Sequence, residues 1–178
     1  VLGKPIAHSL SPVIHNAEQV EMLRLAPHAG DLDVYVKVNS GMNRLGFATD
    51  GLRPAYNAIR MHPHVRSVTL MTHFADADGA VGVKEQLAWF RELTKDYDAP
   101  HSLANSAALI RFPETHGAWV RPGIMLYGCS PFSDRSAESL ELKPAMTLTS
   151  ELIGTQHLQA GERVGYGFGY EAVGEMTD

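Results

Sequence analysis

The chain has 178 residues, of which 44% are apolar and 20% charged, and its formal net charge is −5. These values are typical of a soluble globular protein, and they give no sign of binding to nucleic acid or to an anionic membrane surface. The sequence contains no run of about 18 apolar residues, so it predicts no membrane span. The single cysteine, Cys129, excludes an internal disulfide and fits a reducing compartment, so we expect a cytoplasmic location.

Helical and strand-like patterns alternate over most of the chain. Strands that alternate with helices of about 10–15 residues imply a parallel α/β array, either a barrel or a doubly wound sheet. No glycine-rich dinucleotide fingerprint follows any predicted strand, which weakens the doubly wound alternative. The predicted helices span residues 16–26, 50–61 (with Pro54 in its first turn), 79–94 and 106–112. The predicted strands span residues 32–38, 65–74 and 102–104, and a strand ends at 119–121.

The character of the sequence changes near Leu140. Residues 144–157 alternate between polar and apolar side chains, 159–162 form a predicted turn, and 163–172 alternate again. This pattern predicts antiparallel β structure. We therefore expect an α/β part over residues 1–140 and the start of a second domain, rich in β structure, over 141–178. Both ends of the chain look cut, so we expect a fragment of a longer protein.

Polar side chains follow each predicted strand, where parallel α/β folds place their active sites. Singly, each has an ordinary structural explanation, such as a surface charge, a core histidine or a helix N-cap. Together they would suit an anionic, aromatic ligand, with a phosphate held at helix N-termini. That combination fits a phosphorylated cofactor in the mouth of a barrel. The residues concerned are Lys37, Arg44, His73, Asn105, Ser106, Arg121, Gly123 and Ile124.

Five motifs in order resemble the alanine racemase family. They are KVNSGMNRLG at 37–46, THFA at 72–75, NSAA at 105–108, RPGIMLYG at 121–128 and GERVGYG at 161–167. The resemblance extends from about Val13 to Ala172. It implies a partial (β/α)8 TIM barrel over 1–140, followed by the start of an antiparallel β-domain over 141–178. It also implies a homodimeric enzyme that uses pyridoxal 5′-phosphate to interconvert L- and D-alanine for cell-wall synthesis.

The resemblance further implies a role for each matched residue. Tyr166 would be the acid/base for the Cα proton, acting in the partner subunit's site, and no metal is implied. Arg121 would face the pyridine nitrogen of the cofactor and keep it unprotonated, while His73 would hydrogen-bond Arg121 and tune Tyr166. Arg44 would approach the phenolic oxygen or the substrate carboxylate, beside Lys37, which is often carbamylated in the family. The cofactor-binding residues would be Asn105, Ser106, Arg121, Gly123 and Ile124.

The second base of such a racemase is a lysine that also forms a Schiff base with the cofactor. In the family it lies in a segment like V-x-K-A-x-A-Y-G-H-G, and no such segment is recognisable in this chain. We therefore expect the isolated chain to be inactive. An alternative is a non-catalytic barrel protein that binds pyridoxal phosphate, although the β-like segment from Pro144 and the presence of Tyr166 argue against it.

Residues 1–16 carry a second resemblance. The sequence GKPIAHSLSP at 3–12 resembles the opening of shikimate dehydrogenase, in which two serines, here Ser9 and Ser11, bind the substrate carboxylate. The rest of that enzyme is not recognisable. We hypothesise that residues 1–12 are foreign and mark a chimeric junction. The alternative is a divergent racemase segment with a chance match.

Overall fold

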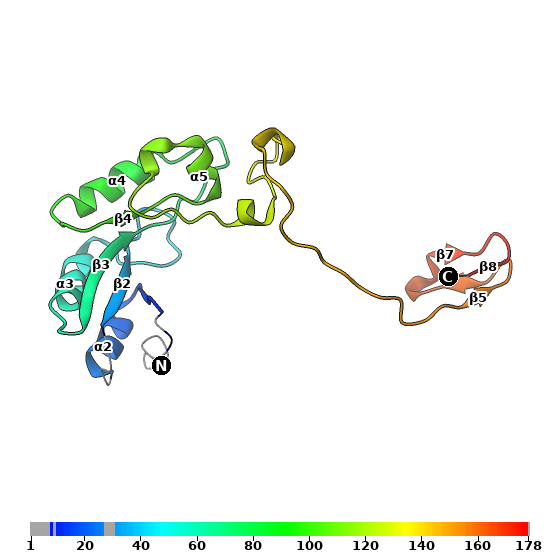
Figure 1. The fold of residues 1–178 in the computed structure, drawn as a ribbon, viewed down its shortest axis with the longest axis horizontal. Helices are drawn as coiled ribbons and strands as arrows, with labels where there is room; N and C mark the ends of the chain where they lie inside the picture. Colours follow the sequence, from blue (N-terminus) through cyan, green and yellow to red (C-terminus); the bar gives the residue numbers. More distant parts are fainter. Residues whose placement is uncertain (1–7, 9, 27–30, 178) are drawn as a thin grey trace. The chain divides into compact units, whose positions relative to one another are not determined.

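The computed structural model describes residues 8, 10–26 and 31–177 of the chain (Figure 1). It divides into two compact units, Val1–Ala145 and Met146–Asp178, close to the predicted change of character near Leu140. Among the described residues, no helix is both long and apolar enough to cross a bilayer. The segment that resembles shikimate dehydrogenase lies largely outside the described residues, because only His8 and the chain from Leu10 onward are described.

A parallel sheet of four strands forms the centre of the first unit. Its strands are β1 (Val13–Ile14), β2 (Leu32–Lys37), β3 (Val65–Met71) and β4 (His101–Ser102), paired in that order. An isolated parallel bridge joins Ser102 to Trp119, so the predicted strand end at 119–121 lies beside β4. Because spatial order equals chain order, each crossover leads to the next neighbour, as in a barrel wall. The described residues form a part of such a wall and do not close it.

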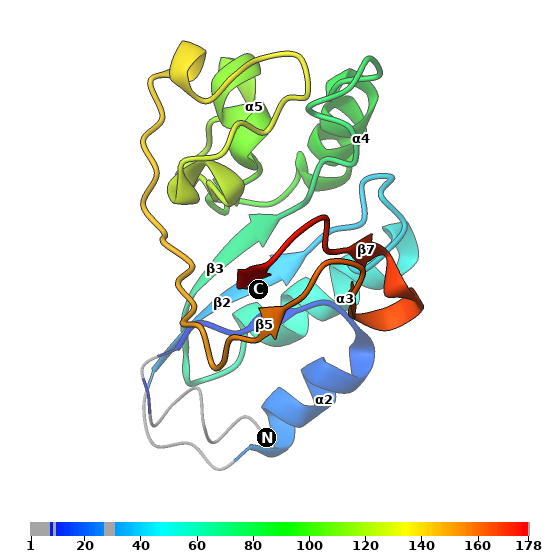
Figure 2. The same ribbon diagram turned by 90° about the vertical axis from the view of Figure 1, so that its right-hand side faces the viewer.

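Three helices connect these strands and a fourth follows β4, and all four bury apolar residues in the core. They are α2 (Ala17–Leu25), α3 (Thr49–Arg60), α4 (Lys84–Thr94) and α5 (Ser106–Arg111), and Figure 2 shows α3 behind strands β2 and β3. Fully buried β-branched and leucine side chains of β2 and β3 pack against leucine, isoleucine and phenylalanine from the helices. Burial of this kind contributes about 25 cal/mol per Å² of apolar surface. The central members of the core are Val34, Val36, Leu70, Leu23, Leu52, Ile59 and Phe90.

Several predicted boundaries require correction. Pro54 is the sixth residue of α3 and not in its first turn, so the helix forgoes the hydrogen bond that an N–H at this position would make. Strand β3 ends at Met71 and not at residue 74. Helix α4 begins at Lys84 and not at residue 79, because the carboxylate of Asp76 accepts a hydrogen bond from the Val81 N–H (2.9 Å) and stabilises a loop there.

The second unit consists of two short antiparallel pairs. Strand β5 (His157–Leu158) pairs with β8 (Met176–Thr177), and β6 (Arg163–Val164) pairs with β7 (Tyr170–Glu171). Antiparallel pairing was predicted here, but the prediction of a strand over 144–157 is wrong, because residues 144–156 form none.

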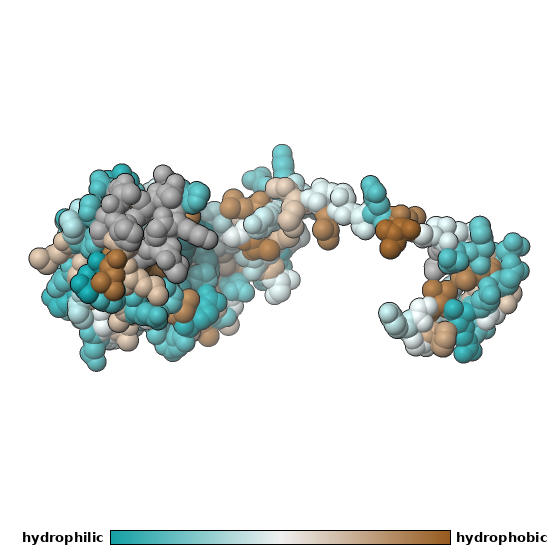
Figure 3. Space-filling model, turned by 90° about the horizontal axis from the view of Figure 1, so that it is seen from below, coloured by the Kyte–Doolittle hydropathy of each residue, from teal (hydrophilic) through white to brown (hydrophobic). Residues whose placement is uncertain are grey.

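Large apolar side chains of the segment over 146–156, in the second unit, are not buried. Leu148 is 96% exposed and Ile153 is 104% exposed, and the space-filling view shows apolar residues along this segment (Figure 3). Alternation of polar and apolar residues yields a strand only where a partner strand and a buried face are available.

Candidate active site

The carboxyl ends of neighbouring strands bring four basic side chains together in the first unit. Lys37 is the last residue of β2 and is buried, with 9% of its surface exposed. His73 follows β3 and Arg121 follows the bridge at Trp119; both are half-buried. Arg44 lies in the loop after β2 and is exposed. We call Lys37, Arg44, His73 and Arg121 the cationic cluster.

The pKa values of Lys37 and His73 reflect both burial and the positive charges around them. Burial lowers the pKa of Lys37, and the charges of Arg44 and Arg121 lower it further. Burial also lowers the pKa of His73, followed by the charges of Arg121, Lys37 and Arg44. Within the described ranges, no ion pair connects any of the four with a carboxylate. A concentration of uncompensated positive charge at strand ends is suited to an anionic ligand.

The guanidinium of Arg121 is fixed by acceptors from two strand ends. Its Nη1 donates to the Ser102 carbonyl and hydroxyl, each at 2.7 Å, and its Nη2 donates to the carbonyls of Thr72 (2.6 Å) and Leu103 (3.3 Å). We expected His73 to hydrogen-bond Arg121, but in the described part of the chain the guanidinium bonds these oxygens instead. Sequence reasoning missed Ser102, because its partner lies 19 residues away and no local pattern joins them.

Ser106 and Asn105 organise the turn after β4. The Ser106 Oγ accepts hydrogen bonds from the backbone N–H groups of Gly123 (2.7 Å) and Met125 (3.4 Å), which ties the start of α5 to the segment after Arg121. The Asn105 Oδ1 accepts from the Ala108 N–H (2.9 Å) and so caps α5. Polar groups are thus gathered at a helix N-terminus, where a phosphate-binding site was predicted.

A cavity of about 310 Å³ opens between these groups. It is lined by six of the eight residues predicted from strand ends, whereas Lys37 and Arg44 lie nearby without lining it. The six are His73, Asn105, Ser106, Arg121, Gly123 and Ile124. The structure therefore brings together residues from the ends of β3 and β4 and from the segment after Trp119.

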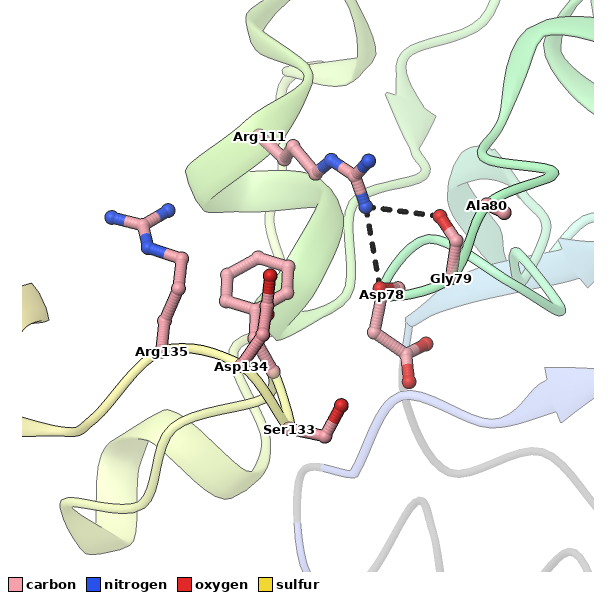
Figure 4. A pocket seen from close by; sticks show the side chains of 8 residues that line it. Asp78, Gly79, Ala80, Arg111, Ser133, Asp134 and Arg135 are labelled. Atoms are coloured by element: carbon pink, nitrogen blue, oxygen red, sulfur yellow. Dashed lines mark hydrogen bonds between the residues drawn. The ribbon is translucent and has the colours of Figure 1, made fainter.

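Asp78 also lines this cavity and was not predicted. It lies at the boundary with a second cavity, of about 460 Å³, formed with the loop at 132–135. Figure 4 shows the Arg111 guanidinium reaching the backbone at 78–79, where it donates to the carbonyls of Asp78 (3.2 Å) and Gly79 (3.0 Å). The Asp78 carboxylate is thereby free of Arg111 and adds a negative group to an otherwise cationic surround.

Tyr166 belongs to the second unit. It begins a short 3-10 helix, Tyr166–Phe168, directly after Gly165, whose φ of 72° is in the left-handed region that favours glycine. Its side chain is 109% exposed within the described residues. Its assignment to the site of a partner subunit stays a prediction.

The first unit is a parallel α/β domain of barrel type, with a cavity lined by polar and basic side chains at its strand ends. Comparison with known proteins agrees with this fold and identifies the family. The family described as alanine racemase, N-terminal domain, matches residues 2–131. The chain therefore belongs to this family.

Relatives and solved structures extend the likeness over nearly the whole chain. The chain is 52% identical over 163 residues to the alanine racemase of Thiobacillus denitrificans, covering 92% of this chain and 44% of that protein. It is 46% identical over 172 residues to that of Nitrosospira multiformis, covering 95% and 48%. The biosynthetic alanine racemase of Pseudomonas aeruginosa superposes with a TM-score of 0.80 at 42% identity, covering 98% of this chain and 49% of that one. The chain thus spans about half the length of the curated relatives it matches.

Proposed function

We propose that this chain forms part of a pyridoxal-phosphate-dependent alanine racemase and contributes the phosphate side of its active site. The observation that carries the proposal is the cavity between His73, Ser106 and Arg121, beside the buried Lys37. A cavity with convergent donors and groups of perturbed pKa is the usual form of a cofactor site.

The donor set fits pyridoxal 5′-phosphate. Asn105, Ser106 and the backbone at Gly123 and Ile124 would hold the phosphate, because hydroxyl, amide and backbone N–H groups are good partners for its oxygens. Arg121 would lie against the pyridine nitrogen; a guanidinium does not give up its proton, so that nitrogen would stay unprotonated. The bound cofactor supplies an electron-withdrawing ring that acidifies the Cα proton of the amino acid.

Other residues of the cationic cluster, besides Arg121, would orient the substrate. Arg44 would pair with its carboxylate or with the phenolic oxygen of the cofactor, and Lys37 would support Arg44 from the end of β2. Tyr166, from the partner subunit of a homodimer, would take or return the Cα proton on one face. As a general acid/base, Tyr166 would exchange this proton through its phenolic hydroxyl. His73 would lie beside Arg121 in the same site and help to tune Tyr166.

Racemisation also needs a base on the opposite face, which is a lysine in this family. We identify none in this chain, so we propose that the 178 residues alone do not racemise alanine. We also propose that residues 1–140 form part of a barrel and that residues 141–178 begin a β-domain. The family match from residue 2 favours a racemase origin of residues 1–12 over a chimeric junction. The extent of the curated matches, 92–95% of the chain, favours a racemase over a non-catalytic barrel protein.

A hybrid enzyme tests this function. The matching segment of the Thiobacillus denitrificans racemase is replaced by this chain, and formation of D-alanine from L-alanine is measured. We expect the unaltered hybrid to be active. Its Tyr166→Phe variant should be about 100-fold or more slower, which is the usual size of a general acid/base contribution. Tyr170→Phe is the matched control and should retain activity. Equal rates for Tyr166→Phe and the unaltered hybrid would contradict the role of Tyr166.

A further inference from the structure

Gln86 lies in the first turn of α4, and its half-buried side chain brackets the backbone at His73. Its Oε1 accepts a hydrogen bond from the Ala75 N–H at 2.8 Å. Its Nε2 donates to the His73 carbonyl at 3.3 Å. One side-chain amide therefore holds the backbone on both sides of Phe74.

The backbone at 72–74 needs such partners because β3 ends at Met71. Beyond that point the sheet no longer supplies a donor for each carbonyl, and unpaired backbone groups are costly. Three successive carbonyls are instead taken by three side chains. Arg121 donates to Thr72 O (2.6 Å), Gln86 to His73 O (3.3 Å) and Asn105 to Phe74 O (3.4 Å). Two of these donors belong to the candidate site, and Gln86 is the third.

Gln86 also adjoins the loop that carries Arg44. A Cβ atom built on Gly41 would lie 3.5 Å from the Gln86 Cγ and 3.8 Å from its Nε2. Ser40, Gly41, Ala75 and Gln86 line one cavity of about 380 Å³. The side chain of Gln86 thus lies between the segment with His73 and the loop with Arg44.

We propose that Gln86 is a positioning residue that holds His73 within the cationic cluster. The proposal rests on the proposed function in that it gives His73 its place in the cofactor site. Gln86 does not line the cofactor cavity and acts only through the backbone of His73 and Ala75. Its loss should let the segment move, so that the imidazole becomes more hydrated and more distant from the three cations that lower its pKa.

The test compares Gln86→Leu and Gln86→Met with Glu85→Leu in the 178-residue chain. Glu85 is the preceding helical residue, is exposed, and has no hydrogen bond or ion pair within the described chain. The pKa of His73 is measured by NMR titration of the histidine rings, with His73→Gln identifying its signal. Amide hydrogen exchange of Ala75 is measured on the same samples.

We expect both Gln86 variants to raise the pKa of His73 toward its ordinary value, by about 0.5 or more, and to speed exchange at Ala75 about tenfold. Glu85→Leu should change neither. An unchanged pKa of His73 in folded Gln86 variants would overturn the proposal. So would loss of the fold in both Gln86 variants but not in Glu85→Leu, because Gln86 would then be a structural residue. These titrations contain no cofactor, so their outcome does not depend on cofactor binding. The assay of the hybrid enzyme tests the proposed function separately.

Discussion

Arg121 is the side chain that connects most of the candidate site. Burial is the main cause that lowers the pKa of Lys37 and of His73, and the charge of Arg121 lowers both pKa values further. The four hydrogen bonds of Arg121 join the ends of β3 and β4. A planar guanidinium presents five N–H donors in a rigid fork spread over three nitrogens, whereas an ammonium has three donors on a single nitrogen and cannot match four acceptors over this span. The geometry therefore requires arginine, and charge alone would not suffice.

Arg121→Lys should accordingly destabilise the first unit although it retains the charge. Buried carbonyls of Thr72 and Leu103 would lose their donor, and we expect the free energy of unfolding to fall by about 2 kcal/mol. Urea denaturation followed by circular dichroism measures this. Arg135→Lys is the control, because Arg135 is exposed and lies over the Phe132 ring, 5.4 Å from its centroid. A midpoint for Arg121→Lys equal to that of Arg135→Lys would refute the anchoring role.

At the level of elements, the two residues of the short strand β4 differ in how their side chains are satisfied: Ser102 is hydrogen-bonded, whereas a ring nitrogen of His101 is not within the part of the chain that the structure describes. Ser102 fixes Arg121, whereas the preceding His101 stacks edge-on against Phe90, with ring centroids 5.1 Å apart. The His101 Nε2 is buried and has no hydrogen-bond partner within the described residues. Burial lowers the pKa of His101, and the charge of Arg91 lowers it further.

This environment predicts a loss of stability in acid. Because the pKa of His101 is lower in the folded than in the unfolded chain, the unfolded chain binds more protons once the pH falls below about 6.5. Stability should therefore decrease from that pH downward, and His73 adds an effect of the same sign. In His101→Leu, the urea midpoint should fall less between about pH 7.5 and pH 5.5 than in the unaltered chain. An identical fall in both proteins would show that His101 does not contribute.

The sequence predicted the elements well where local signals decide them. Asn16 and Asn105 cap α2 and α5 as expected of asparagine before a helix, and the apolar runs of β2 and β3 identify buried strands. That six of the predicted residues would gather around one cavity also followed from the sequence, because parallel strands deliver their carboxyl ends to one edge of the sheet; their roles stay predictions. Gln86, Ser102 and Asp78 could not be predicted, since their contacts join residues far apart in sequence. The strand predicted over 144–157 failed because alternation does not reveal whether a partner strand exists.

For the whole molecule, the central claim is that the first unit contains a site for the phosphate of pyridoxal 5′-phosphate. The chain spans about half the length of its curated relatives, with 44% and 48% of two of them covered. A binding measurement on this chain therefore isolates its own share of the site. Pyridoxine 5′-phosphate is the suitable probe, because it lacks the aldehyde that reacts with surface lysines.

Calorimetric titration of the 178-residue chain with pyridoxine 5′-phosphate and with pyridoxine is the most direct test. We predict that the phosphorylated compound binds at least about tenfold more tightly, and that Ser106→Ala reduces this preference by about tenfold, the worth of a charge-assisted hydrogen bond. Ser139→Ala, an exposed serine outside the site, should leave it unchanged. Equal affinity for the two compounds, or a preference that Ser106→Ala does not alter, would contradict the account.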